Sequence, residues 1–256
     1  MAPKPGALDP SIQRAAHRVN MKQTIADRRT RYKREAAEAA ADRVASGDIV
    51  GLGTGSTAVW VVRGLAERLA RGRLSDILCI ATSQVTEDEA RRSGLALTTL
   101  GSHPVVDITI DGADEIDPRL NVIKGGGGAL LREKIVALAS RRWVVVADES
   151  KLSDALGQRR SLPVEVVRFG WQSQKSFLER LGANVARRVA PDGIPFVTEQ
   201  GHYILDCRFG PLKDVHTLAT TIKARTGVVE HGFFLDMAHL AIVAGAQGVR
   251  CFPLNP

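Results

Sequence analysis

The chain has 256 residues, of which 44% are hydrophobic and 25% are charged. This composition is typical of a soluble globular protein and excludes disordered, collagen-like and disulfide-scaffold chains, and the longest apolar runs are far shorter than the ~20 residues of a membrane span. The net charge of +7 comes entirely from residues 1–34, so the neutral remainder gives no support for a nucleic-acid-binding domain.

The first residues of the chain form a basic leader with three prolines among the first ten positions. Because this stretch has no sustained apolar periodicity, we predict that residues 1–30 are disordered. They lack the apolar centre of a secretory signal. An arginine-rich organelle transit peptide is the alternative, although its two acidic residues are unusual for one, and Met21 is a second candidate start.

Strands and helices alternate in the first half of the chain. The predicted helices cover residues 31–44, 57–71, 86–93 and 129–140, and the predicted strands cover residues 48–53, 77–82, 105–110 and 143–147. Each strand is continuously apolar, which is typical of strands buried on both faces of a parallel sheet. This half therefore predicts an α/β fold with a doubly wound, Rossmann-like, mostly parallel sheet.

After Pro163 the predicted strands and helices no longer alternate one by one. Strands are predicted at residues 164–167, 184–189, 203–206 and 228–231, and helices at residues 172–181 and 212–225. This order, βαββαβ, indicates a smaller α+β domain of ferredoxin-like type. Leu240–Val243 is a last buried strand that we expect to return to the first sheet. We therefore assign residues 31–160 and 235–252 to a Rossmann-like catalytic domain and residues 161–234 to the small domain.

Cysteine and histidine usage gives no candidate metal site. The three cysteines, Cys79, Cys207 and Cys251, have no CxxC spacing. We therefore expect free, mostly buried thiols in a reducing compartment, and a cytoplasmic protein. None of the six histidines pairs with another at the spacing of metal ligands.

A glycine-rich turn, Gly51-Leu-Gly-Thr-Gly-Ser-Thr57, joins the first predicted strand to the next helix. Glycines let the backbone approach an anion, and the helix N-terminal amides and the hydroxyls of Thr54, Ser56 and Thr57 can donate to it. The dinucleotide-binding pattern GxGxxG fails at Ser56, and no Gly-Lys-Ser/Thr follows as in a P-loop. The turn predicts a cradle for phosphate or sugar hydroxyls, with an ordinary tight turn as the alternative.

Five acidic residues lie within residues 107–117, at the end of the third predicted strand. Ligands of open α/β sheets bind outside the carboxyl ends of the strands, so Asp111 and Asp114 lie where a binding site is expected. A solvated acidic loop is the alternative. A divalent metal is a rival use of the carboxylates, but no histidine lies near and the spacing is not that of a calcium-binding loop.

A lone lysine, Lys124, precedes four glycines that open the next helix, which places an ammonium and free backbone amides at an anion-attracting corner. Glu133 lies in the early turns of this helix, where its position alone indicates a surface residue that favours the helix dipole. Lys151 follows another strand end and by itself is a weak hint. Together, four strand ends bring hydroxyls, carboxylates and lysines to one edge of the sheet, which suits a small phosphorylated polyol.

At these residues the sequence resembles the type A family of ribose-5-phosphate isomerases. The matching stretches are Gly51–Thr57, Asp111–Ile116, Ile123–Gly127, Arg132–Ile135, Ala147–Lys151 and Leu162–Val166. They occur in the family's order with similar separations, and the resemblance runs from about Lys33 to about Gly245. It implies interconversion of D-ribose 5-phosphate and D-ribulose 5-phosphate in the non-oxidative pentose phosphate pathway, without a metal or an organic cofactor.

The resemblance also implies roles for individual residues. Glu133 is similar in position to the family's catalytic base, which moves a proton between C1 and C2 of the sugar through an enediolate. The family's substrate-binding segments match Thr54, Gly55, Ser56, Thr57, Asp111, Gly112, Ala113, Asp114, Lys124, Gly125, Gly126, Gly127 and Lys151. Lys124 is expected to stabilise the developing oxyanion, and Asp111 and Asp114 to hold hydroxyls and assist opening of the furanose ring. Lys124 favours an ionised Glu133 and the aspartates oppose it, and the sequence does not say which effect is larger.

Parts of the chain lie outside the resemblance, and other functions stay open. The leader and the residues after Gly248 inherit no role, and Gly128 is one glycine more than the family's usual three. A non-catalytic sugar-phosphate sensor is the alternative, although the leader is short for a helix-turn-helix. A metal-dependent isomerase on another fold is a third hypothesis. The family suggests a homodimer or homotetramer, and we expect no nucleic-acid or membrane partner.

Overall fold

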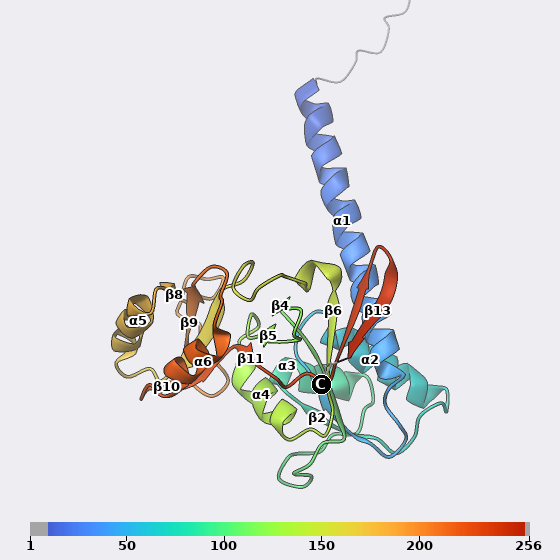
Figure 1. Ribbon diagram of the computed structural model, residues 1–256. Helices are drawn as coiled ribbons and strands as arrows, with labels where there is room; N and C mark the ends of the chain where they lie inside the picture. The colour runs from blue at the N-terminus through green and yellow to red at the C-terminus, as the bar shows by residue number, and fades with distance from the viewer. Residues whose placement is uncertain (1–9, 254–256) are drawn as a thin grey trace, which may run out of the picture.

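The computed structural model describes residues 10–253, with side chains from residue 24 onward. Its largest element is a six-stranded sheet with the strand order β13-β12-β6-β3-β1-β2 (Figure 1). The strands are β1 (Ile49–Leu52), β2 (Leu78–Ala81), β3 (Ile108–Gly112), β6 (Trp143–Asp148), β12 (Leu240–Gly245) and β13 (Gly248–Pro253). Neighbours are parallel except β12 and β13, which form an antiparallel pair at one edge. The predicted doubly wound, mostly parallel sheet is therefore confirmed.

The strand order places a crevice at the centre of this sheet. The chain runs outward from β1 to β2, returns to β3 on the other side of β1, and continues to β6 and β12. Where the order reverses, the loops after the two central strands diverge and leave room for a ligand at the carboxyl ends. Here that point lies between β1 and β3, beside Gly53, which follows β1, and Asp111, which lies in β3.

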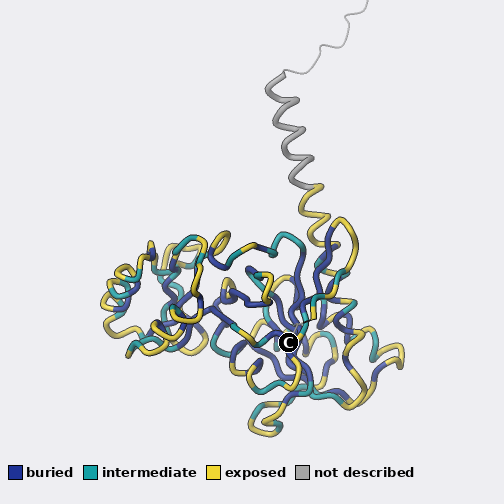
Figure 2. The backbone as a smooth tube through the Cα atoms, viewed as in Figure 1, coloured by how far each residue is buried: buried dark blue, intermediate teal, exposed yellow. Residues whose placement is uncertain are grey.

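Helices cover both faces of the large sheet. They are α1 (Pro10–Ala41), α2 (Ala58–Ala70), α3 (Gln84–Arg92) and α4 (Leu130–Leu138). Because side chains alternate along a strand, β6 contributes to two cores. Val144 and Val146 pack with α1 and α2, whereas Val145 and Ala147 pack in a separate cluster with Ala137 of α4. In Figure 2 the central strands are coloured as buried, and because helices cover both faces these strands are continuously apolar.

Helix α1 begins at Pro10, well before the predicted helix start. Residues 10–30 are helical and so differ from the disordered leader that we predicted, and residues 1–9 lie outside the described residues. The physical reason is the lack of helix breakers. Pro10 occupies the first helical position, which proline tolerates, and no proline or glycine follows before Gly47.

The packed part of α1 is its second half. Tyr32, Ala36 and Ala40 are buried against the large sheet and α2, whereas residues 24–31 are exposed. In Figure 1 the first half of the helix extends away from the rest of the molecule. Among the residues of α1 whose side chains the structure describes, those that contribute to the core therefore begin at Tyr32.

The second sheet has four strands in the order β10-β7-β9-β8, and every neighbouring pair is antiparallel. Its elements are β7 (Leu162–Val166), α5 (Trp171–Arg180), β8 (Asn184–Arg187), β9 (Tyr203–Arg208), α6 (Val215–Lys223) and β10 (Val228–His231). The order along the chain is the predicted βαββαβ. Leu178 of α5 and Ile222 of α6 pack in one core with Val164 and Val166 of β7. The chain then returns to the large sheet, as the sequence predicts, and there β12 pairs with β6.

The structure also contains a third sheet, which is not predicted from the sequence and has three strands in the order β11-β5-β4. Its strands are β4 (Glu115–Ile116), β5 (Val122–Ile123) and β11 (Phe233–Phe234), and a 3-10 helix, η1 (Glu149–Lys151), follows β6. Strands of two residues are too short to show a hydrophobic period. This sheet nevertheless fixes two residues of interest, because the Asp114 N–H donates to the Ile123 carbonyl and the Lys124 N–H to the Gly232 carbonyl, each at 2.9 Å.

The three cysteines are free, with Cys79 and Cys207 buried and Cys251 exposed, in agreement with the prediction. Burial raises the pKa of the Cys79 thiol to about 12, which makes this thiol unreactive. Within the part of the chain that the structure describes, no helix is long and apolar enough to cross a membrane.

Candidate active site

The glycine-rich turn, the acidic loop, the lysine–glycine segment and Lys151 meet at one pocket of about 90 Å³. Its lining consists of Thr54, Gly55, Ser56, Thr57, Gly112, Ala113, Asp114, Lys124, Gly125, Gly126, Gly127, Glu133 and Lys151. All of these residues are among those that the sequence singles out. Asp111 is the exception in the predicted set, because it lies fully buried behind the lining, in contact with Lys124.

The turn after β1 packs directly on Asp111. A Cβ at Gly53 would lie 2.1 Å from Asp111 Oδ1, so this position accepts only glycine. The Thr54 N–H donates to the same oxygen at 3.1 Å. The Thr54 hydroxyl interacts with the hydroxyls of Thr82 and Ser83, each at 2.8 Å, so α3 and the end of β2 hold the turn in place.

Three ionisable groups form a buried chain behind the pocket. Lys124 Nζ lies 2.9 Å from Asp111 Oδ1 and 3.3 Å from Glu133 Oε1, and none of the three side chains is more than 5% exposed. The same ammonium donates to the Gly112 carbonyl at 2.6 Å. The Lys124 ammonium therefore lies near three acceptors, and its distance to Glu133 is the longest of the three.

Burial decides the protonation of Glu133. It raises the pKa of this carboxyl to about 8, because desolvation outweighs the favourable charge of Lys124, and Asp111 raises the pKa further. Of the charge effects that the sequence leaves open, that of Lys124 is larger than that of either aspartate, and desolvation exceeds all of them. A carboxyl with a pKa near the working pH is suited to accept a proton and to return it.

Burial also shifts the pKa values of the other two members of the chain, Lys124 and Asp111. Burial alone would lower the pKa of Lys124, but the carboxylates of Asp111 and Glu133 hold it above its usual range, so the lysine stays cationic. Burial also raises the pKa of Asp111, which Lys124 and the N–H groups of Gly112 and Thr54 oppose. Glu133, with a pKa raised to about 8, therefore lies beside a lysine that stays cationic.

One oxygen of Glu133 is available for chemistry. Glu133 Oε2 is buried and has no hydrogen-bond partner among the described residues. A buried oxygen without a partner is unfavourable unless a ligand supplies one. Because Glu133 also lines the pocket, this oxygen can receive a proton from a bound molecule.

Asp114 and Lys151 bring opposite charges to the pocket wall. Asp114 Oδ2 accepts a hydrogen bond of 2.7 Å from the Gly126 N–H, which ties the acidic loop to the lysine–glycine segment. Burial lowers the pKa of Lys151, and the charge of Asp114 opposes this shift. The pocket therefore combines hydroxyls, amides, carboxylates and ammonium groups.

Lys33 is a neighbour of the pocket that the sequence analysis does not single out. Its ammonium donates to Ser56 Oγ at 2.8 Å, from the packed half of α1. Its position in a basic stretch carries no signal of its own, because most lysines in such stretches are solvated. Only the packing of α1 against α2 brings it to the glycine-rich turn.

Comparison with known proteins decides the family. A model of the ribose 5-phosphate isomerase A (phosphoriboisomerase A) family matches residues 78–248. The chain belongs to this family. It is therefore an isomerase, and the resemblance indicated by the motifs is confirmed.

Relatives match the chain over most of its length. Ribose-5-phosphate isomerase A of Chloroflexus aurantiacus is 52% identical over 218 residues, which are 85% of this chain and 91% of the relative. That of Roseiflexus castenholzii is 53% identical over the same share of this chain and 93% of its own. The solved ribose 5-phosphate isomerase of Plasmodium falciparum is 40% identical and has a TM-score of 0.85 over 88% of this chain and 98% of its own.

A further solved relative has been determined as a complex with a ligand. It is a D-ribose-5-phosphate isomerase in complex with phospho-erythronic acid, 33% identical, with a TM-score of 0.85 over 87% of this chain and 98% of that chain. The family and the fold thus agree over most of the chain.

The described residues contain no group of three or more His, Cys, Asp and Glu side chains placed to hold a metal ion. The carboxylates of Asp111 and Glu133 instead face an ammonium group. Dependence on a metal is therefore a question for an assay with a chelator.

Proposed function

We propose that the chain interconverts D-ribose 5-phosphate and D-ribulose 5-phosphate, with Glu133 as the base that moves a proton between C2 and C1. The observation that supports this most directly is the buried carboxyl of Glu133. This residue lines the pocket, its Oε2 has no partner among the described residues, and its pKa is raised to about 8. A carbon acid beside a carbonyl needs such a positioned base.

In the conversion of the aldose to the ketose, two protons change their positions on the sugar. Glu133 takes the proton from C2 of the open-chain aldose, and the C–H electron pair forms the C1–C2 double bond while the electrons of the carbonyl move to O1. The proton of the C2 hydroxyl then moves to O1, which becomes a hydroxyl, and O2 becomes a carbonyl. The electron pair of the C1–C2 double bond takes the proton back from Glu133 and forms the new C1–H bond. No electron donor or acceptor other than the sugar is required.

Lys124 stabilises the oxyanion in this scheme. When Glu133 becomes protonated, its 3.3 Å contact with Lys124 Nζ weakens, and the third proton of the ammonium is released for the negatively charged oxygen of the sugar. Asp111, which is fully buried, keeps the ammonium in place and acts through Lys124 rather than on the substrate. Asp114, on the pocket wall, accepts hydrogen bonds from sugar hydroxyls and assists opening of the furanose ring.

The phosphate binds at the other end of the pocket, where α2 begins. Thr57 is the N-cap residue of this 13-residue helix, but its side chain makes no capping hydrogen bond. The first amides of α2 and the hydroxyls of Ser56 and Thr57 are therefore available for an anion, and Lys33 and Lys151 add positive charge. The ligand of the solved relative, phospho-erythronic acid, is also a phosphorylated compound.

The test of this function is formation of ribulose 5-phosphate from ribose 5-phosphate by the purified chain, with and without EDTA. Turnover that resists the chelator supports the proposal. Turnover that EDTA abolishes would indicate a metal-dependent reaction, and binding of ribose 5-phosphate without turnover would favour the sugar-phosphate sensor.

The pH dependence of kcat/KM reports the protonation of Glu133 in the free enzyme. Because the base must be ionised and its pKa is raised to about 8, we expect kcat/KM to fall about tenfold per pH unit below that value and to level off above it. If the acid limb of this pH profile instead reported the ionisation of the substrate's phosphate group, it would lie near a pKa of about 6. The control is Asp114→Asn, which removes a charge that raises the pKa of Glu133 and so moves the limb to lower pH. A wild-type limb at or below pH 6 contradicts the proposal.

Deletion of residues 1–30 is expected to leave kcat/KM within twofold of the full chain and the melting temperature nearly unchanged. Residues 24–30 bury no side chain, and the packed part of α1 begins at Tyr32. Lys33, which reaches Ser56, is retained. Steady-state kinetics and thermal unfolding of both forms check this. An inactive or unfolded truncated protein would show that the first half of α1 is required.

We also propose that the chain is a cytoplasmic homodimer or homotetramer without a nucleic-acid or membrane partner. Two large apolar side chains on the outer face of α4, Ile135 and Leu138, are 47% and 69% exposed and are available for contact with a second copy. Light scattering that gives the mass of a single chain would contradict the oligomer.

A further inference from the structure

The connection between β8 and β9, residues 188–202, joins two strands of the small sheet but contacts the lysine–glycine segment and the helices α3 and α4. We call it the β8–β9 connector. It is held in shape by its own backbone, with hydrogen bonds from the Phe196 N–H to the Arg188 carbonyl at 3.0 Å and from the Thr198 N–H to the His202 carbonyl at 2.9 Å. Because these hydrogen bonds fix the conformation of the connector, the residues that it contacts are held in place relative to the small sheet.

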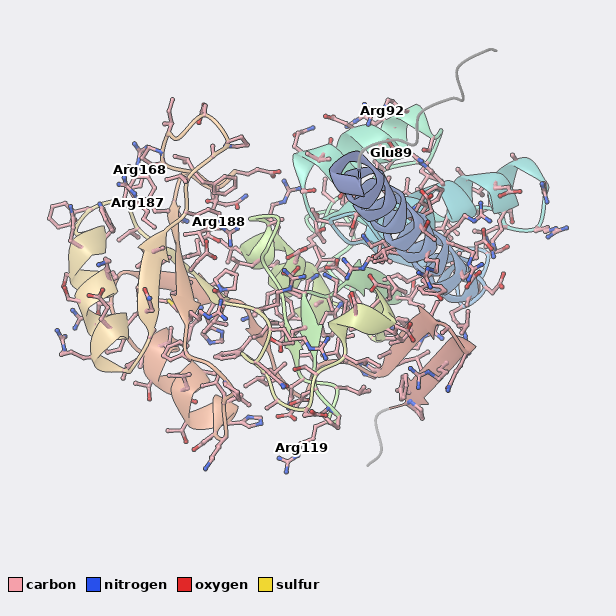
Figure 3. The ribbon with its side chains drawn as sticks, turned by 90° about the horizontal axis from the view of Figure 1, so that it is seen from above. Glu89, Arg92, Arg119, Arg168, Arg187 and Arg188 are labelled. Carbon is pink, nitrogen blue, oxygen red and sulfur yellow. The ribbon has the colours of Figure 1, made fainter. Side chains whose placement is uncertain are left out.

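Arg188, at the start of the connector, binds the lysine–glycine segment of the pocket. Its Nη1 donates to the carbonyls of Gly125 and Gly126 at 2.8 and 3.1 Å. The rest of the guanidinium is fixed by Asp206 of β9, with Nε and Nη2 donating to the carboxylate at 2.9 and 2.6 Å. Figure 3 shows Arg188 on the side of the small sheet that faces the large one, whereas Arg168 and Arg187 lie on the outer side.

The glycines that Arg188 holds have no side chains to fix their conformation. Gly125 has φ of +103°, which glycine adopts without strain, and free glycines sample many other conformations. A peptide unit is planar, so an external donor on its carbonyl also fixes the direction of its N–H. Arg188 therefore sets the direction of the amides that follow.

Those amides belong to the pocket. The Gly126 N–H shares a peptide with the Gly125 carbonyl and donates to Asp114 Oδ2 at 2.7 Å. The Gly127 N–H shares a peptide with the Gly126 carbonyl, Gly127 lines the pocket, and no described residue accepts a hydrogen bond from this amide. It is thus a free donor next to Lys124 and Asp114.

Two further contacts bring the connector against the same segment and against α4. The ring of Phe196 lies on Gly128, where a Cβ would come within 2.4 Å of its Cζ. This accounts for the fourth glycine, which the resemblance leaves without a role. Glu199 accepts hydrogen bonds from the Gln84 N–H at 2.7 Å and from Arg132 Nη1 at 2.6 Å, next to the base in α4.

We propose that Arg188 is a positioning residue of the isomerisation, which holds the Gly125 and Gly126 carbonyls so that the Gly127 N–H is aimed at the sugar oxygen that becomes negatively charged. The inference rests on the proposed function. A donor that is already oriented stabilises the transition state more than the ground state, whereas a mobile glycine segment must be ordered in each turnover. The small sheet then contributes to catalysis without touching the substrate.

The test compares Arg188→Met, Arg188→Lys and the wild type in steady-state kinetics, in binding of phospho-erythronic acid and in thermal unfolding. For Arg188→Met we expect kcat to fall about 30-fold, with KM and the affinity for phospho-erythronic acid changed less than threefold. Arg188→Lys should have a higher kcat than Arg188→Met but a lower one than the wild type. Its ammonium can donate to a glycine carbonyl, but it cannot also form the bidentate pair with the Asp206 carboxylate.

The control is Arg225→Met, which removes an arginine just after α6 that hydrogen-bonds Gln174 and Ser173 and lies over the ring of Phe177, away from the pocket. It should retain kcat within twofold. The proposal is overturned if Arg188→Met keeps its kcat, or if kcat and KM change together and in proportion to the loss of melting temperature in both variants. If Arg188→Met does not fold, the kcat of Arg188→Lys serves as the test. A kcat of Arg188→Lys equal to that of the wild type then overturns the proposal. Wild-type protein without turnover would instead refute the isomerase reaction itself.

Discussion

Replacement of Glu133 by Gln is expected to lower kcat by about 10³-fold while the affinity for phospho-erythronic acid changes less than threefold. The substitution keeps the shape and the hydrogen-bonding capacity of the side chain but removes its ability to take a proton, and general base catalysis contributes typically about 10²–10⁴-fold. Binding should persist because the phosphate end of the pocket, at Ser56 and Thr57, is unchanged. Single-turnover kinetics and calorimetric titration measure the two quantities separately.

The matched control for this variant is Glu165→Gln. Glu165 is also a fully buried glutamate with an oxygen that has no partner among the described residues, but it lies in β7 of the small sheet. The same change of atoms at the same burial should leave kcat within threefold of the wild type. If Glu133→Gln turns over at a rate close to that of the wild type, Glu133 is not the base.

The sequence located the site because strand ends of a parallel sheet converge. The glycines after β1 and the acids after β3 can be placed from hydrophobic periodicity alone, and strand order then makes them neighbours. Glu133 is different. Its position in the first turn of α4 indicates an exposed residue, and only 4% of it is exposed, because α4 packs between the large sheet and the connector of the small one. The family resemblance assigned its role where position did not.

Residues that reach the pocket from distant elements could not be found from local patterns. Lys33 comes from α1, whose first half extends beyond the predicted start because nothing in the sequence breaks the helix. Arg188 comes from the small sheet, and its contacts with Gly125 and Gly126 depend on how the two sheets are joined. The protonation of Glu133 likewise depends on burial, which is a property of the packed molecule.

Replacement of Lys124 by Met is expected to lower kcat/KM by about 10²–10³-fold, because loss of one preorganised donor to an oxyanion has an effect of that size. A second consequence follows from charge. Lys124 is the group that lowers the pKa of Glu133, and without it two buried carboxyls, Asp111 and Glu133, remain side by side. The acid limb of kcat/KM should therefore move from near pH 8 to higher pH.

The stability of Lys124→Met provides an independent readout of the same charges. Removal of one partner of a buried ion pair destabilises a protein by about 3–5 kcal/mol when the other charge stays unpaired. The folded-state pKa values of the two carboxyls rise above their unfolded values, so both are protonated and tolerated at low pH, and stability is lost as pH rises through the unfolded values. The melting temperature of the variant should thus approach that of the wild type at pH 5 and fall well below it at pH 8.

Lys134→Met is the control that separates catalysis from burial. Lys134 is the next buried lysine, 8% exposed, and its ammonium lies 2.7 Å from Glu230 Oε1 rather than at the pocket. Its loss should lower the melting temperature but leave kcat/KM within about fivefold, since its charge contributes nothing to the oxyanion. If both lysine variants lose kcat/KM equally, the effect is one of stability, and the oxyanion role of Lys124 is wrong. If only Lys124→Met loses it, and its acid limb moves upward, the same ammonium both stabilises the enediolate and sets the charge of its base.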